Sequence, residues 1–339
     1  MSVRSTLSAL AALTGVVFVV FVAFCLYAFI ASSSSYLLLP DSPHPLAPLV
    51  EVKGGHDNGQ GGFYFVDVVE RQATLAERYV SFLRDGGELV SRQDVVPANL
   101  NERESARLDA AAMVRSKTIA EAVALEHLGY HVVIHPSGMR IEQTAEGSPA
   151  AAKLLPGDVI VAVDGKAALT ESRLRALIER HRVGQTVELT IVRAGRRQQL
   201  AIRTYALRPR PRMPMIGVFL TQAASIKLPI KVEINAGNVV GPSAGLAFAL
   251  ELTEKLNGNA DRGYRVAATG ELALNGSVVP IGGVEQKVIG AKRAGIEIML
   301  VPAGDNATEA RHYAGDMKII AVTSFQQALR ALATLPPHK

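Results

Sequence analysis

The 339-residue sequence has one cysteine, no tryptophan and no block of like charges, and each shortage excludes a class of protein. A single cysteine excludes a disulfide framework and a cysteine-rich zinc site. The 36 basic and 31 acidic side chains are scattered and aromatic residues make up only 5%, so we expect no nucleic-acid partner. Hydrophobic residues, at 48%, are sufficient to build a core. At roughly 150 residues per domain, the length predicts about two domains and a surplus of residues that belong to neither.

An uncharged apolar run at the N-terminus, residues 7–30, accounts for the surplus. As a helix it would be about 36 Å long, which exceeds the roughly 30 Å of a bilayer's hydrocarbon core. A cleaved signal peptide has a shorter apolar region of about 7–15 residues and small residues at its cleavage site. Here Phe29 and Ile30 occupy those positions. We therefore predict a transmembrane helix that contacts membrane lipid, with a cleaved signal peptide as the alternative.

The charges that flank this run predict its orientation. Arg4 precedes it, and no further basic residue occurs until Lys53. Since basic residues favour the cytoplasmic side, residues 1–6 should be cytoplasmic and the rest of the chain should lie outside the cytoplasm. This describes a single-pass protein of the cell membrane with its folded part on the extracytoplasmic side. The serines and prolines of residues 31–60 predict an extended spacer without regular structure.

Residues 61–129 are expected to form an α/β segment that leads into the next domain. Aromatic and β-branched residues predict a strand at 61–70. A short helix is expected at 74–84. Apolar residues at spacings of three and four predict a longer helix over 101–128, which Gly129 ends.

Three histidines in this region have the spacing of a metal-binding helix. His127, His131 and His135 follow one another at intervals of four. Gly129 breaks the helix that would align them, and no nearby carboxylate completes a ligand set. We therefore expect no metal ion, and no other cofactor is indicated.

Residues 130–206 combine short strands with tight turns. A hydrophobic strand is expected at 159–163, a helix at 171–181, and a strand hairpin around Gly195. The segment SPAAAKLLPGDVIVAVDG, residues 148–165, closely resembles the signature of bacterial PDZ domains. An unrelated small α/β domain is the alternative.

The resemblance implies that an extended peptide C-terminus binds as an added strand beside the second helix. Residues 129–139, where the carboxylate-binding loop is expected, lack the usual Gly-Leu-Gly-Phe pattern. Recognition of a C-terminal carboxylate therefore stays open. A stiff proline- and arginine-rich linker, residues 207–214, follows this domain.

The last domain, residues 215–335, contains two residues suited to nucleophilic catalysis. Ser243 lies in Gly-Pro-Ser-Ala-Gly at the start of a helix, where unpaired N–H groups could bind an oxyanion. Lys287 lies one turn into a later helix among Val284 and Val288, where burial and the helix dipole both disfavour a charged amine. A neutral lysine could therefore act as a base. Taken separately, the serine could simply cap its helix, and the lysine could be an ordinary solvated residue.

The order and spacing of three motifs favour the catalytic interpretation. GPSAG, TGE and PIGGVEQK occur in sequence, and together they strongly resemble the proteolytic domain of Lon-type serine peptidases over about 120 residues. The resemblance implies that Ser243 is the nucleophile, that Lys287 is the general base, and that Thr269 helps to orient the lysine. An acid often precedes GPSAG in that family, whereas this sequence has Val240.

Most of the chain resembles the bacterial membrane-anchored PDZ–Lon protease family. The resemblance implies an α/β (α+β) fold: an N-terminal transmembrane helix, a small β-rich PDZ domain and a C-terminal Lon-type proteolytic α/β domain. It also implies an endopeptidase that acts on protein or peptide substrates. Oligomerisation, the substrate and its cleavage site stay open.

Three rival functions compete with this one. GPSAG also fits the nucleophile elbow of α/β-hydrolases, for which Asp305 and His312 would have to complete a triad. An ATP-driven protease would need a phosphate-binding loop of the form GxxxxGK[ST], and the sequence contains none, so we expect no ATP. A catalytically silent PDZ scaffold at the membrane is the third.

Overall fold

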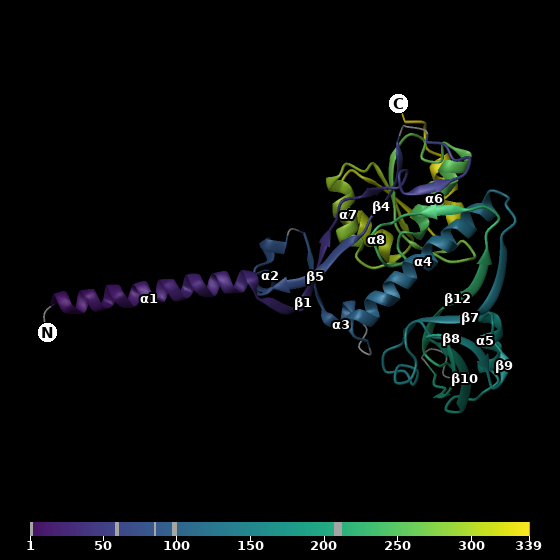
Figure 1. The fold of residues 1–339 in the computed structure, drawn as a ribbon, viewed down its shortest axis with the longest axis horizontal. Coiled ribbons are helices and arrows are strands. Elements are labelled where there is room, and N and C mark those ends of the chain that lie inside the picture. The colour runs from purple at the N-terminus through teal and green to yellow at the C-terminus, as the bar shows by residue number, and fades with distance from the viewer. Residues whose placement is uncertain (1–2, 58–60, 85, 97–99, 207–211, 339) are drawn as a thin grey trace.

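The computed structural model describes residues 3–57, 61–84, 86–96, 100–206 and 212–338, and it shows a mixed α/β protein with one long N-terminal helix (Figure 1). This helix, α1 (Val3–Ile30), extends away from the rest of the chain. Its segment Leu13–Ile30 has a mean hydropathy of 2.7 and is nowhere buried by other parts of the protein. The helix is thus long and apolar enough to cross a membrane.

The segment after α1 is part of the fold, and the prediction of an irregular spacer at 31–60 is wrong. Strand β1 (Ser32–Pro40) lies between β5 (Val68–Thr74) and β6 (Glu88–Ser91) in an antiparallel sheet. Two further short strands, β2 (His44–Pro45) and β3 (Val50–Val52), pair with strands of other sheets.

The reason is that the apolar residues of this segment bury their side chains while its prolines avoid the interior of the sheets. Leu37 and Leu46 are fully buried. Pro40 ends β1, and Pro45 lies in β2 at the edge of its sheet. In these places the missing N–H of proline removes no interior ladder bond. Residues 58–60 of the expected spacer lie outside the described residues.

Residues 61–129 match the prediction in outline. The single strand expected at 61–70 is two strands, β4 (Gly62–Phe65) and β5, separated by Val66 and Asp67. The helical elements that follow are α2 (Leu75–Tyr79), a 3-10 helix (Ser81–Arg84), α3 (Arg92–Val95) and α4 (Glu102–His127). Asn101 caps α4 by accepting a hydrogen bond from the N–H of Glu104, which explains the sharp start.

A second sheet has the order β11-β10-β8-β7-β12, with the short strand β9 paired to β8. Its strands are β7 (Val133–Thr144), β8 (Val159–Val163), β9 (Lys166–Ala167), β10 (Thr186–Arg193), β11 (Arg196–Arg203) and β12 (Val218–Lys227). Helix α5 (Glu171–Ile178) packs against it. Residues 149–153, between β7 and β8, form turns.

The edge strand β12 is the unexpected member of this sheet. Its residues fall in the range predicted for the last domain, 215–335, yet all ten pair with β7. Most of the linker expected before it, residues 207–214, lies outside the described residues. Strand β12 then runs toward β13 (Val232–Ile234), which pairs with β3. The PDZ-like sheet and the C-terminal part of the chain are therefore joined by a continuous segment.

The third sheet positions the candidate site. Its order is β18-β17-β14-β4-β2, and all neighbours except the β4–β2 pair are parallel. The new strands are β14 (Arg265–Ala268), β17 (Ile298–Pro302) and β18 (Lys318–Val322), and β15 (Glu271–Leu272) and β16 (Val278–Val279) form a separate hairpin. Because β4 pairs with β14, residues before the PDZ-like sheet complete the C-terminal α/β domain.

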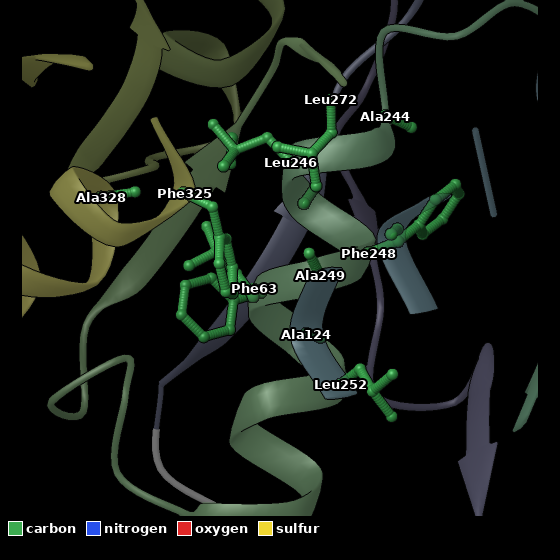
Figure 2. Close-up of a cluster of buried hydrophobic side chains, with 14 of the residues drawn as sticks. Phe63, Ala124, Ala244, Leu246, Phe248, Ala249, Leu252, Leu272, Phe325 and Ala328 are labelled. Carbon is green, nitrogen blue, oxygen red and sulfur yellow. The ribbon is translucent and has the colours of Figure 1, made fainter. Parts of the chain in front are cut away.

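Helices cover both faces of this sheet. One face packs on α4, α6 (Gly245–Asn257) and α9 (Phe325–Ala333), where Phe63, Leu246 and Phe325 belong to one core (Figure 2). The other packs on α7 (Val284–Arg293) and α8 (Asp305–Tyr313). Successive strand residues alternate between the two cores, as strand geometry requires. The fold is thus a three-layer α/β sandwich.

Candidate active site

Ser243 lies in a loop just before α6, and helix α4 holds this loop from the side. The Ser116 hydroxyl on α4 donates a hydrogen bond of 2.9 Å to the carbonyl of Pro242. The N–H of Gly241 donates to the carbonyl of Asp109, also on α4, at 3.1 Å. Gly241 has a φ of +90°, a conformation that favours glycine. The loop that carries Ser243 is thereby fixed by a helix more than a hundred residues earlier in the sequence.

The carbonyl of Ser243 is fixed from the opposite direction by the end of strand β14. It accepts hydrogen bonds from the N–H of Gly270 at 2.8 Å and from the Thr269 hydroxyl at 3.3 Å. Thr269 is fully buried, and its N–H donates to the carbonyl of Leu300 in the neighbouring strand. Such positions at the carboxyl ends of parallel strands are where α/β sheets place their binding sites.

Lys287 reaches both residues from the first turn of α7. Its Nζ donates to the Ser243 Oγ at 2.8 Å and to the Thr269 Oγ1 at 3.3 Å. The side chain is 3% exposed, and Val284 and Val288 on the same helix are buried with it. The structure therefore brings together Ser243, Thr269 and Lys287, the three residues predicted from the sequence.

Burial lowers the pKa of Lys287 from 10.5 to about 8, since a charged amine loses its hydration there. The negative charge of Asp67 acts in the opposite direction and raises this pKa. A substantial fraction of the amine is consequently neutral near pH 8, where it can accept a proton. The serine hydroxyl is the nearest proton donor to it, at hydrogen-bonding distance.

Asp67 and its neighbours belong to none of the motifs recognised in the sequence. Asp67 follows the end of β4, and its Oδ1 lies 3.2 Å from the Nε2 of His44. The same nitrogen lies 3.6 Å from Asp41 Oδ2. Burial raises the pKa of the Asp67 carboxyl. The available signal was an acid directly after a buried strand, but it could not be assigned to Lys287 without knowing that β4 lies beside β14.

The structure offers no support for the hydrolase triad or for the histidine series. Asp305 and His312 lie on α8, where the His312 ring packs edge-on against Tyr313. The His127 ring packs edge-on against Phe325 in the same way. The Ser243 Oγ is instead hydrogen-bonded to the amine of Lys287.

A groove of about 520 Å³ lies between α5 and the beginning of β12. Leu174 and Ile178 line it from the helix, and residues 215–220 line it from the strand. Because β12 is the last strand of its sheet, its outer edge is unpaired within that sheet. The strand beside α5 is therefore β12. The carboxylate-binding loop was expected at residues 129–139, but these residues do not line this groove.

Comparison with known proteins agrees with both parts of the fold. Residues 126–204 match the PDZ domain family, and residues 218–334 match the C-terminal proteolytic domain of Lon proteases. Lon protease 1 of Sorangium cellulosum is 45% identical over 80 residues, which are 23% of this chain and 10% of that protein. Lon protease of Clostridium beijerinckii is 38% identical over 108 residues, 30% of this chain and 13% of that protein. The chain thus spans only about a tenth of the length of these relatives.

Two solved structures are similar to the PDZ-like part. The PDZ domain of an SdrC-like protein from Listeria monocytogenes is 27% identical, with a TM-score of 0.24, and covers 25% of this chain and 87% of its own. The corresponding domain from Listeria innocua is 25% identical, with a TM-score of 0.23, and covers 24% and 92%. From the family matches, the chain contains a PDZ domain followed by the proteolytic domain of the Lon family of serine proteases.

Proposed function

We propose that this chain is a membrane-anchored, ATP-independent serine endopeptidase in which Ser243 is the nucleophile and Lys287 the general base. The observation that carries the proposal is the 2.8 Å hydrogen bond between a buried lysine amine and the Ser243 Oγ. A serine hydroxyl becomes an effective nucleophile when an adjacent base takes its proton. A neutral amine can do so without a third residue to select a tautomer.

The reaction follows from this geometry. The Ser243 Oγ attacks the carbonyl carbon of the scissile bond while its proton passes to Lys287 Nζ. The tetrahedral intermediate then expels the amine, which takes the proton from the lysine, and an ester links Ser243 to the substrate. Water attacks this ester while Lys287 again accepts a proton, and Lys287 returns that proton to the Ser243 Oγ as the ester bond breaks and the second product leaves. Thr269, 3.3 Å from Nζ, keeps the amine directed at the serine.

The oxyanion would form at the start of α6. The N–H groups of Gly245 and Leu246 already donate to the carbonyls of Pro242 and Gly270. The preceding N–H groups, those of Ser243 and Ala244, are therefore our candidates for binding the developing negative charge.

The proposal includes the location of the protein in a membrane and cleavage that needs no ATP. The apolar helix α1 supports anchoring, and Arg4 before it supports a cytoplasmic N-terminus with the proteolytic domain outside the cytoplasm. The sequence contains no GxxxxGK[ST] phosphate-binding loop, in keeping with cleavage that needs no ATP. We therefore expect unfolded segments of proteins, or peptides, as substrates.

A serine-reactive probe tests the proposal most directly. Purified full-length chain in detergent should react with a fluorophosphonate and cleave an unstructured peptide without ATP, since the base keeps Ser243 nucleophilic. Ser243→Ala should abolish both. Ser225→Ala, a serine of β12 away from the dyad, is the matched control and should leave both unchanged. A wild-type chain that neither reacts nor cleaves would favour the silent scaffold.

We further propose that the groove beside β12 binds the C-terminus of a peptide substrate as an added strand. The outer edge of β12 offers backbone hydrogen bonds, and Gly217, with a φ of +80°, bends the chain at the start of the strand. The N–H groups of Ile216 and Gly217 are our candidates for the carboxylate. Leu174 and Ile178 would hold an apolar terminal side chain.

This proposal predicts binding that depends on a free carboxylate. With the Ser243→Ala chain, a fluorescent peptide ending in an apolar residue should bind at micromolar Kd, and its amidated form should bind at least tenfold more weakly, because charge-assisted hydrogen bonds are lost. Met215→Glu, which adds a like charge to the groove, should weaken binding similarly. Gln199→Glu adds the same charge on β11, at the far end of the sheet, and should have no effect. Equal binding of acid and amide would contradict the assignment.

A further inference from the structure

Asp67 lies at the same edge of the sheet as the candidate dyad. In the parallel pair of β4 and β14, Phe65 is opposite Ala268. Continuing this register by two residues places Asp67 level with Gly270, next to Thr269 at the end of the neighbouring strand. Asp67 and Thr269, which accepts a hydrogen bond from the Lys287 amine, therefore follow the ends of two neighbouring strands at the same edge of the sheet.

The residue after Asp67 touches the helix that carries the lysine. A Cβ built on Gly283 would lie 3.0 Å from a methyl group of Val68, so the two residues are in contact. The carbonyl of Gly283 in turn accepts the N–H of Lys287 at 3.1 Å. The segment around Asp67 is thus packed, through the Val68 side chain, on the residue that precedes the first turn of α7, and Lys287 lies in that turn.

His44 holds the Asp67 carboxylate on the protein side. Its ring stacks on Phe65, with centroids 4.7 Å apart and planes inclined by 17°. Its Nε2 and the Asp67 Oδ1 are 3.2 Å apart, and both atoms are shielded from solvent. The separation is that of an ion pair, although the atoms are not aligned as a hydrogen bond. With Asp41, these side chains bring three polar atoms within 4.8 Å of one another.

Other charged groups surround α7, and none of them replaces Asp67. Glu285 lies on the helix itself, and its N–H donates to Glu309 of α8 at 3.2 Å. Glu88 of β6 acts on Tyr313, which is hydrogen-bonded to Glu285, and Arg293 at the end of α7 lies near Gly86. Among the charged groups of the described residues, Asp67 is the one whose charge raises the Lys287 pKa, against the effect of burial.

We propose that Asp67, held in place by His44, is a positioning residue for Lys287: its negative charge stabilises the protonated amine and so sets how far into the acidic range the enzyme works. The proposal rests on the proposed function, in which Lys287 is the base.

The test is the pH dependence of peptide cleavage by the full-length chain in detergent. Asp67→Asn removes the charge and keeps the shape, so the acidic limb of the kcat/KM profile should move to lower pH by roughly half a unit to one unit. The alkaline plateau should change by less than about threefold. Asp67→Glu keeps the charge, so the acidic limb of its profile should fall at nearly the same pH as that of the wild type. Glu285→Gln, which removes a carboxylate from α7 itself, is the matched control and should not move the limb.

The role of His44 is tested by comparing its variant with Asp67→Asn and with the double variant. His44→Phe keeps an aromatic ring on Phe65 but removes Nε2, so the limb should shift in the same direction as in Asp67→Asn and by less. In the double variant it should add nothing to the shift of Asp67→Asn, because His44 acts only through the carboxylate. An additional shift in the double variant would contradict the proposed role of His44.

A measurement that needs no activity separates this proposal from the proposed function. In the Ser243→Ala chain, the titration of Lys287 can be followed by NMR of a chain with labelled lysine, with Lys287→Met assigning the signal. Asp67→Asn should lower the titration midpoint by the same roughly half to one unit. The positioning role of Asp67 would be overturned if Asp67→Asn left the titration midpoint of Lys287 unchanged. It would also be overturned if this variant lowered the alkaline plateau of kcat/KM without moving the acidic limb. Absence of cleavage by the wild type would instead contradict the proposed function.

Discussion

Replacing Lys287 by arginine is expected to reduce peptide cleavage by at least about 10⁴-fold, the upper range for loss of a general base. Arginine keeps the positive charge, but its guanidinium does not lose a proton at any pH the protein tolerates. Lys287→Met should be equally inactive, since it has no group that can accept the serine proton. Initial rates of peptide cleavage from pH 6 to pH 10 measure both losses. The wild-type rate should rise through about pH 8, the pKa of the buried amine.

The methionine variant should also be at least as stable as the wild type near pH 7. Folding lowers the pKa of Lys287 from 10.5 to about 8, so the folded state binds its proton less tightly than the unfolded state does. Below pH 8 this costs the fold roughly 3 kcal/mol, and the cost disappears as pH rises from 8 toward 10.5. The stability advantage of Lys287→Met should therefore shrink over that pH range in thermal melts.

Lys292 provides the matched control. It lies on the same helix but is exposed, so Lys292→Arg and Lys292→Met should leave activity and melting temperature close to those of the wild type. If Lys287→Arg retains cleavage, or if Lys287→Met melts several degrees lower at neutral pH, Lys287 is a structural lysine.

Gly290→Ala is expected to destabilise the protein strongly, by an estimated 2 to 4 kcal/mol, although alanine favours helices more than glycine by about 1 kcal/mol. Gly290 lies on the buried face of α7, where a Cβ atom would overlap the carbonyl oxygen of Asp41. The Asp41 oxygen belongs to the backbone, and a Cβ is held rigidly on its own backbone, so neither atom can turn away as the end of a long side chain can. The strand–helix contact would have to open, and α7 carries Lys287.

Thermal melts and peptide cleavage of the variant measure the two effects together. Gly282→Ala is the matched control, because a Cβ at Gly282 meets nothing within 4 Å and its φ is not positive. It should change the melting temperature by no more than a degree or two. A Gly290→Ala chain as stable as the wild type would show that residues 40–42 are not packed on α7 as described.

The candidate site could be predicted from the sequence because its chemistry lies in short motifs. Ser243, Thr269 and Lys287 each follow a recognisable local pattern, and the resemblance to Lon-type domains supplied their order and spacing. Helix α1 and the hairpins of the PDZ domain were predictable for the same reason, since an apolar run or a tight turn is decided by neighbouring residues. The assigned domain boundaries stay predictions.

The tertiary structure alone decided which distant segments complete each part. Residues 32–41 of the supposed spacer are packed on α7, β4 completes the sheet of the proteolytic domain, and β12 completes that of the PDZ domain. Asp67 comes beside Lys287 only through the pairing of β4 with β14. Local hydrophobic periodicity shows which face of a strand is buried but not which strand it pairs with. Pairing partners far apart in the chain are chosen by the free energy of the assembled core, so they became visible only in the folded protein.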